Sequence, residues 1–419
     1  MRRRALLRGL AAAPLPGALA APSIAQAAPR VVVVGGGFAG ATCARRLAAA
    51  GIATTLVEPA TSYLACPFSN LVVAGLRDLE EQRFGFEGLR AAGVAVAQQA
   101  ASVVDPVARR VALADGIVLA YDRLVLAPGI ELRLDALPGY DAAASGEMPH
   151  AWRAGPQTTL LRAQLEAMED GGVVAMSIPA NPYRCPPGPY ERASLVAHYL
   201  ATRKPRSRLL LLDAKDGFSK QRLFEKAWRE LYPGIVEWVP LSRGGRVIEV
   251  QARERVLVTE FGRHRVDVAN VIPPQRAAPV AREAGVADRS GWCPVDPASF
   301  ESRLQPGIHV IGDAAVMGAM PKSAFAANAQ AKACADAIAA LLAGRAPAEP
   351  RLVNTCYSLV APGIGISVAG VYRPASNGLL AEVPGSGGTS PLDAPPEDRR
   401  LEASHAEAWF AAIAAETYG

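Results

Sequence analysis

The sequence predicts an α/β fold with two Rossmann-like dinucleotide-binding domains and a C-terminal interface domain. Three observations predict it. A valine-rich strand runs directly into a glycine fingerprint near the N-terminus, a strand–helix–strand pattern recurs in the middle of the chain, and a later strand ends in Gly-Asp. Strands that alternate with helices are typical of parallel sheets, which bind ligands at the carboxyl ends of their strands.

The fingerprint is the segment 31–40, which reads VVVVGGGFAG. Four consecutive valines indicate a strand buried on both faces. The glycines that follow match G-x-G-x-x-G and allow a tight turn, close approach of a pyrophosphate and close helix packing. A helix is expected over 39–50, with its N-terminus toward the phosphates. The predicted phosphate-binding residues are Gly35, Gly37, Phe38, Ala39 and Gly40.

An acidic residue follows the second strand at the spacing that a dinucleotide site requires. This strand is expected over 53–57, and Glu58 comes directly after it. A carboxylate about 20 residues beyond the fingerprint binds a ribose hydroxyl in such sites. A glycine turn in an ordinary βαβ unit is the alternative, but strand, fingerprint, helix, strand and acid in this order favour a nucleotide site.

Residues 1–27 resemble an export signal, and we expect them to lie outside the fold. The segment 3–8, RRALLR, has the paired arginines of a twin-arginine signal, and 25–27, AQA, is typical of a cleavage site. A membrane anchor is the alternative, but the apolar run is short and contains two prolines. We therefore expect export, cleavage and a periplasmic location.

Composition excludes several classes of function. Removing residues 1–27 takes four of the 44 basic residues and none of the 39 acidic ones, which leaves a net charge of +1. Nucleic-acid binding therefore has no support. No later apolar run is long enough to span a membrane, so we expect no stable membrane insertion. The six cysteines and five histidines lack metal-ligand spacing, and we expect no metal site.

The first domain is expected to comprise 28–139 and 280–352. An apolar strand near 121–127 is stopped by Pro-Gly, where the chain passes to another domain. A return strand, 307–311, ends in Gly-Asp, and the acid is expected to reach the ribityl or pyrophosphate part of a flavin nucleotide; a plain turn is the alternative. A helix expected over 322–342 then has its start near the flavin. The candidate binding residues here are Pro128, Gly129, Gly312, Asp313 and Lys322.

The middle domain, expected over 140–279, repeats the architecture without the fingerprint. A strand is expected over 173–178, a helix near 191–200 and a second strand over 208–212. The loop 179–191 between them reads PANPYRCPPGPYE. Proline has no N–H to offer a phosphate, and its ring blocks close approach. The domain therefore has the form of a nicotinamide-binding domain without the means of binding a pyrophosphate.

The C-terminal domain, expected over 353–419, contains two strands of small residues, a Gly/Pro/Ser loop at 384–396 and a closing helix over 401–416. That helix carries several acidic residues and no basic face for anionic lipid, which argues against a membrane-surface role.

With these features, the whole mature chain resembles the flavoprotein subunit of flavocytochrome c sulfide dehydrogenase. That family lies among the disulfide-reductase-like (glutathione-reductase-like) flavoproteins, which include sulfide:quinone oxidoreductases. Three motifs carry the resemblance: YLAC at 63–66, RCPPGPYER at 184–192 and NTCYS at 354–358. It implies FAD attached through a thioether to Cys66, and a redox-active disulfide between Cys185 and Cys356.

The residues support these roles to different degrees. The alternative for Cys66 is a small buried apolar residue, and the alternative for the bridge is a structural disulfide. Cys185 follows Arg184 and precedes a helix, and both features favour a thiolate. Glu191 is a candidate general base, and an acid that only stabilises a helix N-terminus is at least as good an interpretation.

The resemblance implies that sulfide attacks the bridge and forms a persulfide, that Cys356 is released as thiolate, and that electrons pass through FAD to a c-type cytochrome. No C-x-x-C-H occurs, so the haem, one or two, must belong to a partner chain. Sulfur or polysulfide is the expected product. A sulfide:quinone oxidoreductase, or an accessory flavoprotein of a sulfur-oxidation complex with little turnover of its own, are the alternative functions.

Overall fold

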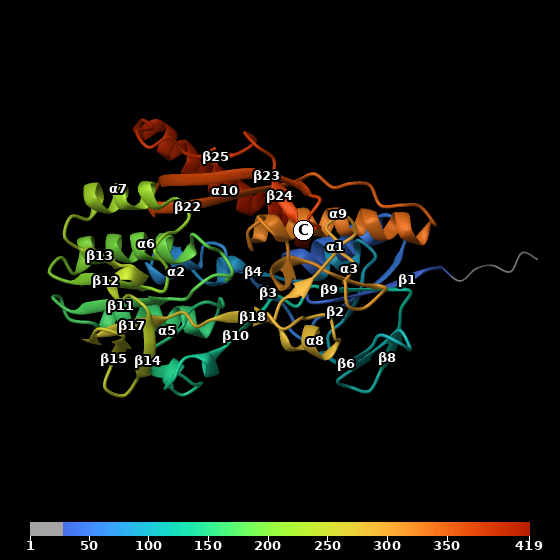
Figure 1. The fold of residues 1–419 in the computed structure, drawn as a ribbon, viewed down its shortest axis with the longest axis horizontal. Coiled ribbons are helices and arrows are strands. Elements are labelled where there is room, and N and C mark those ends of the chain that lie inside the picture. The colour runs from blue at the N-terminus through green and yellow to red at the C-terminus, as the bar shows by residue number, and fades with distance from the viewer. Residues whose placement is uncertain (1–27) are drawn as a thin grey trace, which may run out of the picture.

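The computed structural model describes residues 28–419, and the predicted export signal at 1–27 lies outside the described residues. Figure 1 shows two α/β lobes side by side, one drawn mainly in blue and orange and the other mainly in green. The C-terminal elements, in red, lie across the top of both lobes. The predicted α/β class is confirmed.

A parallel sheet forms the centre of the first lobe. Its middle strand holds four consecutive buried valines, as expected for a strand covered on both faces. The order is β20 (Ile308–Val310), β9 (Arg123–Leu126), β1 (Arg30–Val34), β2 (Ala53–Val57) and β5 (Ala95–Ala97). Because β20 pairs with β9, the chain leaves this lobe and later returns to it. Two helices, α1 (Phe38–Ala49) and α9 (Ala324–Leu342), pack against each other above the sheet (Figure 1).

A second parallel sheet forms the centre of the green lobe. Its order is β13 (Val236–Val239), β12 (Arg208–Asp213), β11 (Val173–Ile178) and β17 (Val268–Val271). Its helices are α5 (Pro156–Ala167), α6 (Gly188–Arg203) and α7 (Gln221–Leu231). Since α6 joins β11 to β12, the predicted strand–helix–strand unit is present, with the proline-rich loop at its expected place.

Two short strands connect the lobes. β10 (Ile130–Leu132) leads away from the first lobe, and β18 (Gln275–Ala277) leads back, the two pairing antiparallel. Glu131 on β10 forms ion pairs with Arg276 and Arg282 at 2.5 and 2.6 Å. The chain thus crosses between the lobes twice, along one paired ribbon.

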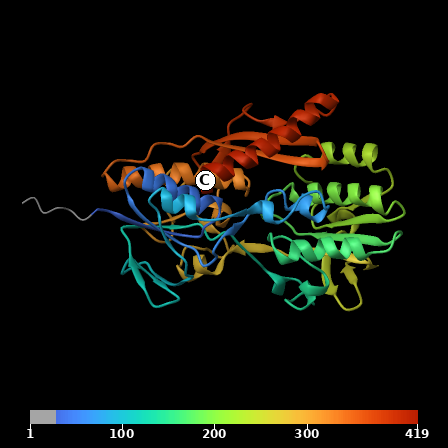
Figure 2. The ribbon, with the colours of Figure 1, turned by 180° about the vertical axis from the view of Figure 1, so that it is seen from behind.

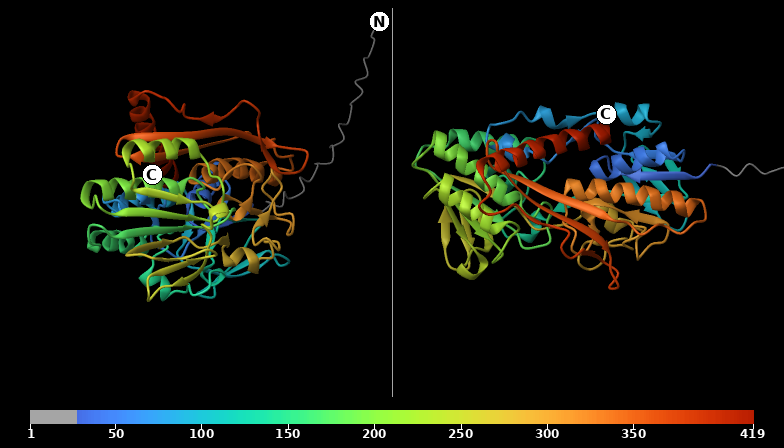
Figure 3. Two further views of the ribbon diagram at one scale, coloured as in Figure 1. Left: turned by 60° about the vertical axis from the view of Figure 1, so that its left-hand side comes forward. Right: turned by 90° about the horizontal axis from the view of Figure 1, so that it is seen from above.

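A long hairpin covers both lobes. It consists of β22 (Leu352–Ala361) and β23 (Ile364–Pro374), and Figures 2 and 3 show it with α10 (Pro396–Tyr418) over the junction of the lobes. β22 contacts α6 from one lobe and α9 from the other. The C-terminal elements therefore form one wall of the region between the lobes.

The predicted helices are present, with three starts displaced. α10 begins at Pro396 and not at 401, because a proline suits the first turn of a helix. It therefore includes Arg399 and Arg400 near its start, and Arg399 pairs with Glu402 at 3.2 Å. α6 likewise begins early, at Gly188, and α9 begins two residues late, after the capping residue Ser323.

The remaining elements are short or peripheral. They are β3 (Tyr63–Leu64), β4 (Arg83–Phe84), β6 (Ala101–Asp105), β7 (Arg110–Leu113), β8 (Val118–Ala120), β14 (Val247–Gln251), β15 (Val256–Thr259), β16 (Arg263–Arg265), β19 (Cys293–Pro294), β21 (Ala315–Val316), β24 (Leu380–Glu382), β25 (Gly388–Thr389), α2 (Ser69–Val73), α3 (Glu87–Ala91), α4 (Ala144–Glu147) and α8 (Pro279–Glu283).

Candidate active site

The fingerprint forms a tight turn between β1 and α1. Gly35 has φ +107°, and a Cβ there would collide with the carbonyl oxygen of Ala127. A Cβ on Gly40 would collide with the carbonyl oxygen of Gly35. At the start of α1 no side chain caps the helix, and its first turn contains no acidic residue. The N–H groups of this turn, which include those of Phe38 and Ala39, are therefore available to an anion.

Glu58 lies against this turn at the end of β2. One carboxylate oxygen accepts a hydrogen bond from the Gly36 N–H at 2.7 Å, and the other accepts from the Ala60 N–H at 3.0 Å. The carboxylate is thus fixed beside the phosphate turn, where a ribose-binding acid is needed. The ribose contact itself stays a prediction.

The Gly-Asp turn after β20 closes the site from the other side. Gly312 has φ +73° and donates its N–H to Gln330 at 2.8 Å. The Lys322 ammonium donates to the carbonyl oxygens of Asp313 and Ala315 at 2.8 and 2.7 Å, and it lies 4.0 Å from the centre of the Trp292 ring. The Lys322 side chain thus stabilises the turn by binding the backbone carbonyls of the turn. Burial lowers the pKa of Lys322 to about 8. Pro128 and Gly129 lie opposite, directly after β9, with Gly129 at φ +68°.

Three buried polar atoms in this region lack hydrogen-bond partners among the described residues. They are Oδ1 of Asp313, Nε1 of Trp152 and Nε2 of Gln275. Arg184 lies among them, because its backbone N–H donates to Gln275 at 2.9 Å and its guanidinium donates to the Trp152 carbonyl. Buried polar groups in proteins are almost always paired. An acceptor and two donors without partners fit a ligand with both hydroxyl groups and ring acceptors, as a flavin nucleotide has.

Cys66 lies between β3 and α2, close to Arg184. Burial lowers the pKa of Arg184, but the charges of Cys66 and Asp313 outweigh it, and the pKa is raised. The Cys66 thiol, the Asp313 carboxyl and the Arg184 guanidinium therefore share one buried region. The site chosen from the sequence for covalent attachment and the carboxylate chosen for the flavin nucleotide thus both lie within electrostatic range of Arg184.

Cys185 occupies the loop between β11 and α6 in a constrained conformation. Its φ is +59°, which is uncommon outside glycine. Its N–H donates to the Lys322 carbonyl at 2.8 Å, and its carbonyl accepts from the Gly188 N–H at 2.8 Å. A Cβ on Gly188 would lie 2.9 Å from the sulfur. The loop is therefore fixed to the first lobe, and glycine at 188 leaves room for the sulfur.

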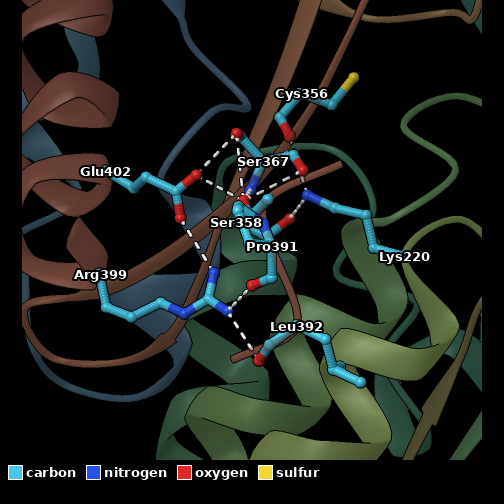
Figure 4. A network of polar contacts seen from close by, with 9 residues as sticks. Lys220, Cys356, Ser358, Ser367, Pro391, Leu392, Arg399 and Glu402 are labelled. Atoms are coloured by element: carbon cyan, nitrogen blue, oxygen red, sulfur yellow. Dashed lines mark hydrogen bonds and ion pairs between the residues drawn. The ribbon is translucent and has the colours of Figure 1, made fainter. Parts of the chain in front are cut away.

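Cys356 lies on β22 and is 7% exposed. Its sulfur accepts a hydrogen bond from the Asn354 amide at 3.3 Å. Figure 4 shows the Lys220 ammonium directed at the strand, where it donates to the Cys356 carbonyl and the Ser358 hydroxyl, each at 2.8 Å. Burial lowers the pKa of Lys220 to about 8. A buried positive charge thus lies beside this cysteine at neutral pH.

Cys185 and Cys356 are both free thiols, and they lie within electrostatic range of each other. Burial raises the pKa of Cys185, and the charge of Cys356 raises it further; Arg184 opposes this less strongly. Arg184 thus favours a Cys185 thiolate, as expected from the sequence, but desolvation outweighs it and the neutral thiol is favoured. Burial also raises the pKa of Cys356, against Lys220 and Asn354. The disulfide itself stays a prediction.

Glu191, the candidate base, joins three elements. Its carboxylate accepts hydrogen bonds from the Asn70 amide at 2.8 Å and from the Leu359 N–H at 2.9 Å. Burial raises the pKa of Glu191, which is the direction a base requires. Both carboxylate oxygens of Glu191 already accept hydrogen bonds, so the side chain positions β22 against α2 and α6. A role as base stays a hypothesis.

Sequence reasoning missed several residues of the site. Buried Arg192 donates to Asn70, Asn270 and the Ala151 carbonyl, and lies 4.9 Å from the centre of the Trp152 ring. Its place in the RCPPGPYER motif was the available signal. Lys220 gave none, because it lies in an ordinary loop before α7 and reaches β22 only through the tertiary fold.

The acid at the end of β12 occupies the position that binds ribose in a working nicotinamide domain. Here Asp213 is fully buried and accepts hydrogen bonds from Tyr190 at 2.6 Å, Lys215 at 2.6 Å and Trp238 at 3.0 Å. The Tyr190 ring stacks on Phe218 with centres 3.6 Å apart. The chain's own side chains thus occupy the carboxylate that a nicotinamide nucleotide would use.

Comparison with known proteins identifies the family. A pyridine nucleotide-disulphide oxidoreductase model matches residues 29–164, the model "Sulfide dehydrogenase (flavocytochrome c) flavoprotein chain, central" matches 158–273, and "Flavocytochrome c sulphide dehydrogenase, flavin-binding" matches 348–418. The sulfide dehydrogenase (flavocytochrome c) flavoprotein chain of Chlorobaculum thiosulfatiphilum is 58% identical over 45 residues, which are 10% of this chain and 94% of that sequence. The chain belongs to the flavocytochrome c sulfide dehydrogenase flavoprotein family.

Solved structures share the fold of this family member. The sulfide:quinone oxidoreductase of Aquifex aeolicus has a TM-score of 0.70 at 17% identity, covering 93% of this chain and 92% of its own. A putidaredoxin reductase in covalent complex with putidaredoxin has a TM-score of 0.63 at 21% identity, covering 90% and 94%. The predicted Rossmann-like architecture is confirmed, and the protein is an FAD-dependent oxidoreductase of the sulfide dehydrogenase class. Among the described residues, no helix combines the length and apolarity needed to cross a membrane.

We expect NADH and NADPH neither to bind tightly nor to reduce the flavin, because prolines replace the phosphate-binding glycines and Asp213 is already paired. Anaerobic stopped-flow absorbance of the flavin measures this directly, with sulfide on the same sample as the positive control. Bleaching by NADH as fast as by sulfide would contradict this view of the middle lobe.

Proposed function

We propose that the protein is a periplasmic sulfide dehydrogenase that oxidises sulfide to sulfur or polysulfide and passes the electrons to a c-type cytochrome. The observation that carries the proposal is that Cys185, before α6, and Cys356, on β22, are both buried within electrostatic range of each other and of Lys220 and Glu191. Two such thiols can form a bridge that a sulfur nucleophile attacks.

In the first step, hydrosulfide attacks one sulfur of the Cys185–Cys356 bridge. A new S–S bond forms to the attacked cysteine, which becomes a persulfide, and the other cysteine leaves with the electron pair as a thiolate. The negative charge arises in a buried region, where an unpaired charge is costly. The protonated Lys220 lies beside Cys356 and offsets this cost.

The residues of the first lobe would hold the cofactor. The turn at Gly35–Gly40, Glu58 and the orphan oxygen of Asp313 would bind its phosphate, ribose and ribityl groups. When bound, FAD supplies an acceptor for two electrons that can release them one at a time. We also propose that Cys66 attaches the flavin covalently, which its place beside Asp313 and Arg184 supports.

The family description, which names a flavocytochrome c, supports the cytochrome as acceptor. We assign 353–419 as the surface for that partner, because these residues form the outer layer over the junction of the lobes (Figure 3). The periplasmic location rests on the predicted signal. Reduction of quinone but not of cytochrome would favour a sulfide:quinone oxidoreductase, and negligible turnover with sulfide would favour an accessory flavoprotein.

Replacing either bridge cysteine should abolish flavin reduction by sulfide. In Cys185→Ser and Cys356→Ser we expect anaerobic bleaching to slow by a factor on the order of a thousand or more, and the double variant to be little worse, because the two sulfurs act as a unit. Cys293→Ala is the control, since it removes a buried cysteine on β19. Near-normal bleaching in either bridge variant would remove the disulfide from the mechanism.

Acid precipitation tests the covalent bond to Cys66. Yellow colour should stay with the precipitated wild-type protein and move to the supernatant in Cys66→Ala, while Cys293→Ala should behave as the wild type. Free flavin in the wild-type supernatant would show that Cys66 forms no thioether.

A further inference from the structure

The two candidate bridge sulfurs differ in their hydrogen bonds. The Cys356 sulfur accepts from the Asn354 amide at 3.3 Å. Among the described residues the Cys185 sulfur accepts no hydrogen bond, and burial, Cys356 and Glu191 all raise the pKa of its thiol. A sulfur that leaves as thiolate needs donors directed at it, because a buried anion without them is strongly destabilised. Only one of the two has such a donor.

The donor to Cys356 is fixed by a chain of hydrogen bonds that starts at a helix. At the N-terminus of α9, the Ala326 N–H donates to the Ser323 hydroxyl oxygen at 3.0 Å. The Ser323 hydroxyl donates in turn to the Asn354 side-chain oxygen at 2.6 Å. That bond leaves the amide N–H group of Asn354 to face the sulfur. Each donor in the chain points from the helix toward Cys356.

Burial makes this chain rigid and strong. Asn354 is 2% exposed and Ser323 is 9% exposed, so water cannot easily replace either contact. Hydrogen bonds that follow one another in a low dielectric polarise each other, and the start of α9 adds the positive end of its dipole. The arrangement is therefore suited to a negative charge on Cys356.

The resemblance to the family implies that Cys356 is the sulfur that leaves. We propose that Asn354, oriented by Ser323, is the residue that binds the thiolate forming on Cys356, and that it thereby favours attack of hydrosulfide on Cys185. The Cys185–Cys356 bond breaks, a bond forms between the substrate sulfur and Cys185, and the electron pair goes to Cys356. No proton or additional oxidant is needed in this step. The assignment rests on the proposed function only in taking these two cysteines as the bridge.

The pH dependence of alkylation in the reduced holoprotein tests the assignment without requiring turnover. Trapping at a series of pH values, followed by mass spectrometry of the peptides, gives a separate midpoint for Cys356 and Cys185. We expect Asn354→Ala to raise the Cys356 midpoint by about one to two pH units, the value of a hydrogen bond to a charged group. The Cys185 midpoint, measured in the same digest, should stay near that of the wild type. The midpoint is compared, and not the rate, because a smaller side chain also admits the reagent more easily.

Two further variants, at Asn354 and Ser323, test the same hydrogen-bond chain. Asn354→Asp preserves the shape if the alanine variant does not fold, and its negative charge should raise the midpoint further. Ser323→Ala should raise it as well, since Ser323 orients Asn354 and its own hydroxyl lowers the pKa of Cys356. Asn328→Ala is the matched control, because it removes a different buried amide, one on α9 that donates to Thr42 at 3.0 Å, and it should leave the midpoint unchanged.

A Cys356 midpoint that stays at the wild-type value in both Asn354 variants would overturn the assignment. The same would follow if Asn328→Ala moved the midpoint as far as Asn354→Ala, since the effect would then be one of general loosening. Failure of the proposed function gives a different signature, namely normal flavin bleaching in the cysteine variants. The two failures can therefore be told apart.

Discussion

The buried contacts between β22 and the middle lobe are the constraint on which the site depends. The Lys220 ammonium donates a hydrogen bond to the carbonyl of Cys356, and the Glu191 carboxylate accepts one from the N–H of Leu359 on the same strand. Hydrogen bonds to charged groups contribute about 1.5–3 kcal/mol each, and removing one partner of a buried charge costs about 3–5 kcal/mol. These contacts fix the register of β22, and with it the position of Cys356.

Burial gives the site its chemical character. Both thiols have raised pKa values because of desolvation, so the neutral thiol and the disulfide are favoured over a free thiolate. The chemistry therefore needs a local compensating charge, which Lys220 and the donors from α9 provide at Cys356. The same burial leaves Asp313 and two nearby donors without partners until a ligand binds. One physical cause thus accounts for both the thiol chemistry and the cofactor site.

Sequence reasoning succeeded where the signal was local. The valine run and the fingerprint predict β1, its turn and α1, because the residues that determine the burial of the strand and the positive φ at Gly35 are adjacent in the sequence. The loss of pyrophosphate binding, which the prolines of the middle loop indicate, stays a prediction. The cysteine motifs identified the three thiols through resemblance to the family. In the structure Cys356 raises the pKa of Cys185, and Cys66 and Cys185 both raise the pKa of Arg184.

The parts that failed depend on contacts between distant segments. The raised pKa of Cys185 comes from burial by both lobes, which a neighbouring arginine and helix start do not reveal. Lys220 reaches β22 from a loop before α7, and Asp213 is paired with Tyr190, Lys215 and Trp238, which are far apart in the sequence or reach it only through the fold. Pairing of this kind follows from the folded arrangement and leaves no periodic or spacing signal in the chain.

The most direct test of the central claim is to locate the sulfur atom delivered by the substrate. Oxidised holoprotein mixed anaerobically with one equivalent of sulfide, trapped at once with an alkylating reagent and mapped by mass spectrometry, should carry one additional sulfur on Cys185 and an alkylated thiol at Cys356. Reduced flavin with no additional sulfur on either cysteine would show that the electrons bypass the bridge.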